Sequence, residues 1–411
     1  MTEQAKVPAI RFAGFTDPWE QRKLGEIASF SKGSGYSKAD IRESGIPLFL
    51  YGRMYTQYET RVDSVDTFAA PRPGTLYSKG TEIVVPASGE SAEDIARASA
   101  ITREGIALGG DLNVVYPQRM VTPLFLAYGL SHGSSQKMLA QKAQGKTVVH
   151  IHASDLKRLG IAFPDVTEQQ AIGTFFSSLD DLITLHQRKY DKLVVFKKSM
   201  LEKMFPKDGE SVPEIRFAGF TDPWEQRKLE DIANRVTRKN EGESDLPLTI
   251  SSQYGLVDQR TFFNNQVASK DMSGYYLLRK GEFAYNKSTS GDSPWGAVKR
   301  LVRYEKGCVS TLYICFGLDG ADPDFLVTYY ETDRWYKAVQ MIAAEGARNH
   351  GLLNIAPNDF FDTALILPPS REEQGLIGLF FARLDDLITL HQRKLELLQN
   401  IKKSLLDKMF V

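Results

Sequence analysis

Residues 7–24 read VPAIRFAGFTDPWEQRKL and residues 212–229 read VPEIRFAGFTDPWEQRKL, so one change separates two segments that lie 205 positions apart. Residues 179–189 (LDDLITLHQRK) return unchanged as residues 384–394, at the same offset. The stretches between these blocks share no comparable run of identity. A duplication has therefore kept its frame while its two inserts diverged, which is expected when the inserts meet different ligands.

The chain has 411 residues, of which 42% are apolar and 25% charged, as in an ordinary globular protein with room for two or three domains. No apolar run is long enough to span a membrane and the first residues carry no signal region, so we expect a cytoplasmic protein without a membrane partner. The net charge of zero neither requires nor excludes a nucleic-acid partner. Cys308 and Cys315 lack neighbouring ligand residues and are expected to be buried thiols.

Each insert carries short β-type runs, bounded by Gly and Pro, in the same order. They are residues 45–51, 82–85 and 112–116 in the first insert and residues 246–250, 281–285 and 309–316 in the second. The two inserts are therefore predicted to share one fold and to differ in their surfaces. The Thr-Asp-Pro-Trp-Glu that precedes each insert is typical of a helix start, and it predicts a short helix through Ile27 and another through Ile232.

The last part of each half has the pattern of a long helix with one apolar seam. The seam positions are Ile172, Phe176, Leu179, Ile183, His186, Tyr190, Leu193, Lys197, Met200 and Met204, and then Ile377, Phe381, Leu384, Ile388, His391, Leu395, Leu398, Lys402, Leu405 and Met409. A seam sustained over about five heptads favours a coiled coil over an ordinary amphipathic helix. Each helix would be roughly 55 Å long.

The two helices are expected to pair with each other, because neither could leave its seam exposed to water. The first helix leads directly into the second insert, which the chain must cross before the second helix begins. The chain then enters the second helix from the opposite side. We therefore expect antiparallel pairing about a pseudo-two-fold axis, with one insert domain at each end of a rod.

Motifs for catalysis are missing. Gly145-Lys146-Thr147 lacks the first glycine and the leading strand of a phosphate-binding loop. His150 and His152 have no carboxylate or cysteine partner at a metal-binding spacing. No Asn-Pro-Pro-aromatic or Asp-Pro-Pro-aromatic tetrapeptide accompanies a methyl-donor loop. We expect a noncatalytic protein with no catalytic residue, no metal and no cofactor of its own.

Two near-identical repeats, two divergent inserts, two long helices and no catalytic motif resemble the specificity (S) subunit of type I restriction-modification systems. The pattern Ile-Arg-Phe-x-Gly-Phe-x-x-x-Trp at residues 10–19 and 215–224 is characteristic of many members, and the resemblance covers the whole chain. It implies that residues 29 to about 152 and 234 to about 354 are target-recognition domains. Each would read one half of a split site in double-stranded DNA.

The resemblance also implies partners. The helices would set the spacing between the half-sites and bind two modification (methyltransferase) subunits, which carry the S-adenosylmethionine and methylate adenine. Restriction subunits, the ATP-dependent translocase and nuclease, would join the full complex. The expected fold class is α+β, with two α/β-mixed target-recognition domains joined by two long antiparallel coiled-coil helices. The expected boundaries are residues 1–164 and 207–368 for the domains and residues 165–206 and 369–411 for the helices.

Base readout needs amide, guanidinium and hydroxyl groups on exposed loops, with cations for the phosphates. Loops of the first insert that are rich in such groups supply Lys32, Ser34, Tyr36, Lys38, Arg53, Lys79, Ser88 and Lys146. Loops of the second insert supply Gln253, Tyr254, Asn286, Lys287, Ser288, Arg348 and Asn349. We predict DNA contacts from each group, although a solvated loop is the alternative interpretation for any single residue.

Two other functions are alternatives to DNA recognition. A noncatalytic coiled-coil scaffold would explain the helices but would give no reason for the inserts to diverge within a constant frame. A cryptic nuclease or methyltransferase is disfavoured by the missing motifs. Sequence-specific DNA recognition is the function that accounts for both the frame and the inserts.

Overall fold

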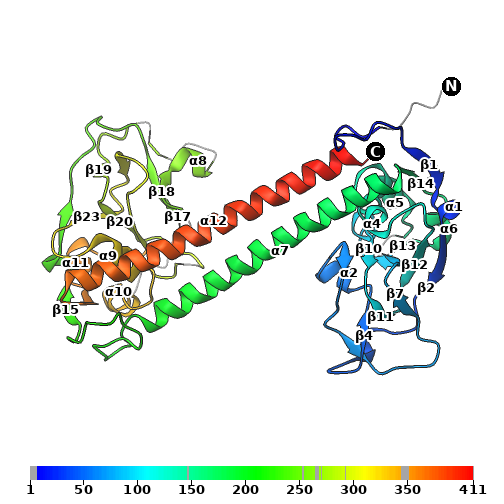
Figure 1. The fold of residues 1–411 in the computed structure, drawn as a ribbon. Coiled ribbons are helices and arrows are strands. Elements are labelled where there is room, and N and C mark those ends of the chain that lie inside the picture. Colours follow the sequence, from blue (N-terminus) through cyan, green and yellow to red (C-terminus); the bar gives the residue numbers. More distant parts are fainter. Residues whose placement is uncertain are drawn as a thin grey trace. The chain divides into compact units, whose positions relative to one another are not determined.

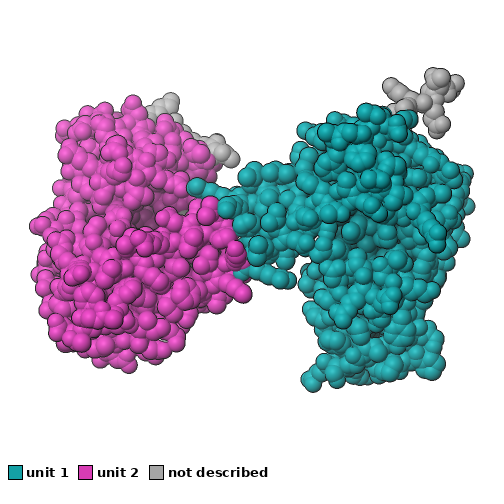
Figure 2. Space-filling model, in the orientation of Figure 1, with its two compact units in different colours: residues 1–188, 392–411 teal, residues 189–391 magenta. Residues whose placement is uncertain are grey.

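The computed structural model describes residues 7–145, 148–251, 254–263, 268–269, 271–291, 293–343 and 351–410. The chain divides into two compact units, Met1–Arg188 with Gln392–Val411 and Lys189–His391 (Figure 2). Two long helices, α7 (Val166–Lys203) and α12 (Arg371–Met409), each contribute one part to each unit. Every unit therefore combines one globular domain with a segment of both helices.

Unit 1 is built on a five-stranded sheet with the order β2-β12-β8-β10-β5. Figure 1 labels β2, β12 and β10 of this sheet. Its strands are β2 (Ala28–Lys32), β12 (Leu112–Pro117), β8 (Ile83–Pro86), β10 (Ser99–Ile101) and β5 (Arg61–Val62). All four residues of the central strand β8 are buried, as its continuous apolar run predicts. The edge strand β5 runs parallel to β10, whereas the other pairs are antiparallel.

Unit 2 contains a sheet of the same order and antiparallel pairing, β16-β23-β20-β21. Its strands are β16 (Ala233–Val236), β23 (Ile314–Leu318), β20 (Phe283–Asn286) and β21 (Ala297–Arg300). They correspond in order to β2, β12, β8 and β10. This correspondence confirms that the two inserts share one fold.

Smaller elements surround each sheet (Figure 1). Unit 1 adds α1 (Leu24–Ile27), η1 (Lys38–Asp40), β3 (Ile41–Arg42), β4 (Ile46–Phe49), α2 (Arg53–Thr56), β6 (Phe68–Ala69), β7 (Tyr77–Lys79), β9 (Ser88–Gly89), α3 (Ala92–Ile95), β11 (Glu104–Leu108), α4 (Pro123–Ser131), α5 (Gly133–Lys142), β13 (Val149–His150) and α6 (Ala153–Lys157). Unit 2 adds η2 (Leu229–Asp231), β17 (Leu248–Ser251), β18 (Gly255–Asp258), α8 (Gln259–Phe263), β19 (Tyr276–Arg279), β22 (Lys306–Val309), α9 (Pro323–Tyr329), α10 (Tyr336–Ile342) and α11 (Pro357–Phe361).

The repeated opening segments form strands, so the predicted start of a helix at the Pro-Trp-Glu of each copy is wrong. β1 (Glu20–Lys23) pairs antiparallel with β14 (Gly160–Phe163), and β15 (Glu225–Lys228) pairs in the same way with β24 (Ala364–Leu367). Only the short α1 and η2 follow as helical turns. A distant strand partner has overridden the local helix signal.

The predicted seam is the less exposed face of both long helices. Ile172, Phe176 and Leu179 of α7, and Ile377, Phe381 and Leu384 of α12, are buried. In unit 1 the Lys402 ammonium of α12 lies 2.5 Å from the Asp180 carboxylate of α7. In unit 2 the Lys197 ammonium of α7 lies 2.5 Å from the Asp385 carboxylate of α12. Since Phe176 contacts Phe410 and Phe205 contacts Phe381, the paired helix segments run antiparallel within each unit.

Both copies of the frame build the same joint between a domain and the helices. The Arg11 guanidinium donates to the buried Glu168 carboxylate at 2.6 and 2.7 Å, and Arg216 donates to Glu373 at 2.6 and 2.8 Å. Likewise, Ile10 N donates to Lys408 O in unit 1, and Ile215 N donates to Lys203 O in unit 2. The repeated residues are therefore those that attach each domain to the helix pair.

The phenylalanine that follows each long helix fills the core of its unit. Phe410 is 7% exposed, and its ring centroid lies 5.3 Å from that of Phe125, 6.1 Å from that of Phe176 and 6.5 Å from that of Trp19. Phe205 fills the same position in unit 2, 5.8 Å from Phe325. The end of α12 thus completes the core of unit 1, and the end of α7 completes that of unit 2.

We expect Phe410→Ala to lower the free energy of unfolding of unit 1 by about 3–5 kcal/mol, because it removes a buried ring and leaves a cavity. Hydrogen exchange followed by mass spectrometry should show faster exchange in α4 and the first turns of α7. The matched variant Phe205→Ala should act in the same way on unit 2. Equal loosening of both units by either variant would contradict this assignment.

Cys308 and Cys315 are free and buried, as predicted. Burial raises the pKa of the Cys308 thiol to about 11 and that of Cys315 to about 12. Both thiols are therefore protonated and unreactive near neutral pH. Among the described helices, none has the length and apolar character needed to cross a membrane.

Candidate nucleic-acid interface

Loops from five parts of unit 1 meet at one end of its central sheet, at residues 32–36, 49–53, 86–91, 109–111 and 148–151. The main-chain bonds that join them run from Gly33 N to Leu112 O, Ser34 N to Leu108 O, Gly109 N to Phe49 O, Ala87 N to Asp111 O and Ile151 N to Ala87 O, with lengths of 2.8 to 3.0 Å. We call this surface the loop edge of unit 1. Its backbone is held by hydrogen bonds, so its side chains project from a rigid base.

Gly33 explains how two of these loops approach so closely. A Cβ atom at this position would lie 1.8 Å from the carbonyl oxygen of Gly109. Any side chain would therefore push β2 away from the β11–β12 turn. The glycine-rich run from Ser31 to Gly35 thus has a structural cause as well as the solvent exposure that suggested a binding loop.

The loop edge of unit 2 forms at the equivalent place, beyond the end of β20. Here residues 286–290 lie against residues 351–355, with Thr289 N donating to Gly351 O at 2.7 Å and Leu353 N donating to Lys287 O at 3.0 Å. In unit 1 the segment before α6 likewise lies against the residues that follow β8, with Ile151 N donating to Ala87 O. Loops at the same place in the two sheets therefore carry different sets of side chains.

Predicted residues at the loop edge of unit 1 differ in their exposure and in whether their side chains already form hydrogen bonds within the domain. Lys32 is exposed at the end of β2, and Lys38 is exposed in η1. Ser34 Oγ donates to Leu108 O at 2.8 Å, so this hydroxyl already supports the turn. The two lysines are therefore better placed than the serine to meet phosphates.

Tyr36 and Ser88 lie at this edge but face inward. Tyr36 is 3% exposed, and its hydroxyl donates to Ala70 O at 3.0 Å. Ser88 is 9% exposed, and its carbonyl accepts a 2.8 Å bond from the Tyr55 hydroxyl. Because both side chains are buried in the domain, we assign them a structural role.

Arg53 and Lys79 complete the predicted set that the structure describes in this unit. The Arg53 side chain is 12% exposed and pairs with Glu59 and Asp66, so contact with a base would require it to leave these carboxylates. Lys79 is exposed, and in the strand register of β7 with β11 it lies opposite Glu104, the first residue of β11. The loop edge lies beyond the other end of β11. The structure therefore does not bring Lys79 together with Lys32.

In unit 2, Asn286, Lys287 and Ser288 gather at the loop edge, but Tyr254 does not. Asn286 Oδ1 accepts a 3.0 Å bond from Ser288 N, and Lys287 Nζ donates to Ile355 O at 3.2 Å. Burial lowers the pKa of Lys287. Tyr254 is 51% exposed and lies under the Arg303 guanidinium, near the opposite end of β20.

Four predicted residues, Lys146, Gln253, Arg348 and Asn349, lie outside the described residues. The β11–β12 turn from Gly109 to Asp111 belongs to the loop edge although it is absent from the predicted set. Gly-Gly-Asp between two apolar runs is a turn signal that could have identified it. Within the described ranges, no cluster of His, Cys, Asp and Glu could hold a metal ion.

Two domains of one topology carry different loop edges on one duplicated helical frame, and this defines a protein with two distinct recognition surfaces. Residues 16–194 match the family model of the type I restriction modification DNA specificity domain. A type I restriction enzyme specificity subunit, MjaVIII of Methanocaldococcus jannaschii, is 20% identical over 221 residues, which are 53% of this chain and 50% of that protein. The match thus spans about half of the length of this curated relative.

A solved structure covers the whole chain. The type I restriction-modification S subunit from M. genitalium is 15% identical and matches with a TM-score of 0.57 over 99% of both chains. This chain therefore has the fold of an S subunit. Its resemblance to type I specificity subunits is confirmed by the family model and by the curated relative.

Proposed function

We propose that the chain is the sequence-specific DNA-recognition subunit of a type I restriction-modification complex, in which each domain reads one part of a bipartite site. The observation that carries this proposal is the pair of loop edges, which form at the same place in two sheets of one strand order while their side chains differ. A coiled-coil scaffold would need no such divergence. The protein would act in the cytoplasm, where it meets the DNA.

Repeated exposed apolar residues on the long helices support partner binding. Leu182 and Leu185 of α7 are 46% and 45% exposed, and Leu387 and Leu390 of α12 are 44% and 45% exposed. They lie outside the seam, so the helix pair does not cover them. Exposed apolar patches mark protein contacts. Because the patch occurs once in each repeat, we propose that it receives two modification subunits, to which restriction subunits are added in the full complex.

The direct test is reconstitution. The purified chain should neither methylate nor cut DNA by itself. Together with type I modification subunits from the same cells and S-adenosylmethionine, it should direct adenine methylation to one split motif. Methyl transfer by the chain alone, or methylation without sequence preference by the reconstituted complex, would overturn the proposal.

Replacing Lys32 by Gln should weaken binding to cognate and scrambled duplexes to a similar extent, because a lysine at the loop edge meets phosphates rather than bases. The slope of log K against log salt should become shallower by about 0.9. Titrations at several salt concentrations measure both effects. Lys79→Gln provides the contrast: an equal loss from Lys79 would show that the DNA-binding surface extends beyond the loop edge.

A further inference from the structure

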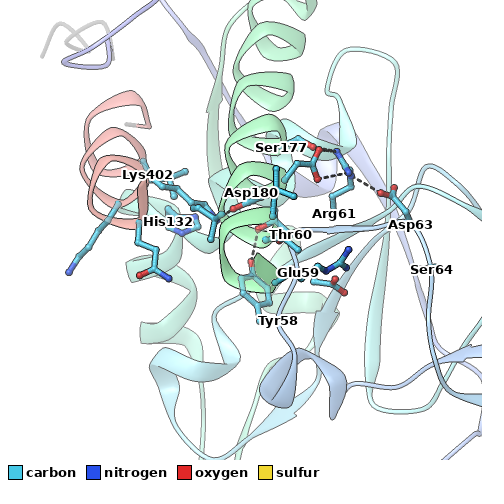
Figure 3. A pocket seen from close by; sticks show the side chains of 18 residues that line it. Tyr58, Glu59, Thr60, Arg61, Asp63, Ser64, His132, Ser177, Asp180 and Lys402 are labelled. Carbon is cyan, nitrogen blue, oxygen red and sulfur yellow. Dashed lines mark hydrogen bonds and ion pairs between the residues drawn. The ribbon is translucent and has the colours of Figure 1, made fainter. Parts of the chain in front are cut away.

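The two long helices are identical over residues 179–189 and 384–394. The two globular domains nevertheless form different ion pairs with them. In unit 1 the Arg61 guanidinium donates to both oxygens of the Asp181 carboxylate, at 2.9 and 3.3 Å. It also contacts the Ser177 hydroxyl one turn away (Figure 3). A fork of this kind fixes geometry as well as distance.

Arg61 lies where it can connect the edge of the central sheet to α7. Arg61 belongs to β5, the edge strand of the central sheet, and its Nε is held by Asp63 at 2.8 Å. It forms one wall of a cleft of about 770 Å³ between the β5 segment and segments of α7 and α12 (Figure 3). The apolar core packs α4, α5 and the neighbouring strand β10 against the first turns of α7. Arg61 adds a charged contact from the edge strand β5 to the next turns of α7.

Unit 2 reaches the same frame at another place. Asp386 occupies the position of Asp181 in the second copy, and no hydrogen bond or ion pair of its side chain occurs within the described residues. Instead, Glu331, which follows α9, accepts a 2.7 Å bond from Lys197, the lysine that also pairs with Asp385. The domain of unit 1 thus pairs with a helix aspartate, Asp181, whereas the domain of unit 2 pairs with a helix lysine, Lys197.

We propose that Arg61 and Glu331 are positioning residues that fix the angle of each recognition domain against its helix segments. The consequence for DNA rests on the proposed function. If each domain reads one half-site, a fixed angle keeps its loop edge aligned with its own half-site at the native gap length. Partly exposed ion pairs add little to stability. We call the pair of Arg61 with Asp181 the Arg61 clamp. Its loss should therefore change the orientation of the domain and the selection of the gap length much more than the stability of the fold.

The test uses the full chain with Arg61→Glu, the charge exchange Arg61→Glu with Asp181→Arg, the conservative Arg61→Lys and the control Asp386→Arg. In the reconstituted complex, with a DNA library of varied gap lengths, Arg61→Glu should lower the preference for the native gap about fivefold, the size of one such ion-pair coupling. The charge exchange should restore most of the preference and Arg61→Lys part of it. The control, placed in the identical sequence of the other helix, should leave it unchanged.

A second readout is independent of DNA. Spin labels at Glu104→Cys in β11 and Thr184→Cys in α7, both exposed in unit 1, report the distance between the globular domain and α7, since the native thiols are buried. The distance distribution should be narrow in the parent protein, broad with Arg61→Glu and narrow again with the charge exchange. An unchanged distribution with Arg61→Glu would overturn the clamp. A parent complex that directs no methylation would overturn the proposed function and leave this distance test decisive for the clamp.

Discussion

Exchange of residues 29–152 for the matching insert of a related specificity subunit should replace one half of the methylated motif and leave the other half intact. The loop edge of unit 1 is built from loops within this range, including residues 148–151, whereas Arg11, Glu168 and Phe410, which form the joint, lie outside it. Each mismatched base pair costs about 1–3 kcal/mol, so with roughly three or more mismatches in the old half-site its methylation should fall by more than about a hundredfold.

Methylation sequencing of cells that carry the exchanged gene measures both halves in one experiment. The reciprocal exchange of residues 234–354 is the matched control, and it should alter only the other half. A change in both halves after either exchange would show that the two domains do not read independently. The repeated joint would then have to transmit sequence information, which its identity in the two copies argues against.

Lengthening both helices by one heptad should shift the accepted gap between the half-sites by about 3 base pairs, since seven residues add roughly 10 Å of helix and each base pair spans about 3.4 Å. Copies of residues 182–188 and 387–393 keep the apolar seam in phase. Both insertions are required because each unit holds a segment of each helix. Methylation of DNA libraries with varied gaps measures the shift.

The single insertions are the controls for this design. A heptad added to α7 alone would prevent the contacts of Asp180 with Lys402 and of Lys197 with Asp385 from forming at the same time. We therefore expect a less stable protein. If the double insertion methylated the original gap at an undiminished rate, the helices would not set the spacing. The modification subunits or the domains themselves would then determine it.

The long helices could be predicted because their seam repeats with a fixed period, and burial of Ile172, Phe176 and Leu179 follows that period. Short apolar runs also predicted β8, β12, β20 and the first part of β23, but they did not predict the other strands of the two central sheets. The opening segment could not, because Glu20–Lys23 becomes a strand only through β14, which lies about 140 residues further along the chain. Local propensity carries no information about so distant a partner.

The candidate interface was predicted less completely than the fold. Lys32, Asn286 and Ser288 fall on the loop edges, because polar residues beyond the end of a strand are usually loops. Tyr36 and Ser88 have the same local signal, yet they are buried by residues distant in sequence, such as Ala70 for the Tyr36 hydroxyl. The Arg61 clamp carries no local signal at all, since Asp181 lies 120 residues away.

The most direct test of the central claim is a comparison of adenine methylation across the genome in cells with and without this gene. If the chain is the DNA-recognition subunit, its loss should abolish methylation at one motif made of two short defined parts separated by a fixed unspecified gap. All other methylated motifs should remain. An unchanged pattern in cells that express the modification subunits would contradict the account.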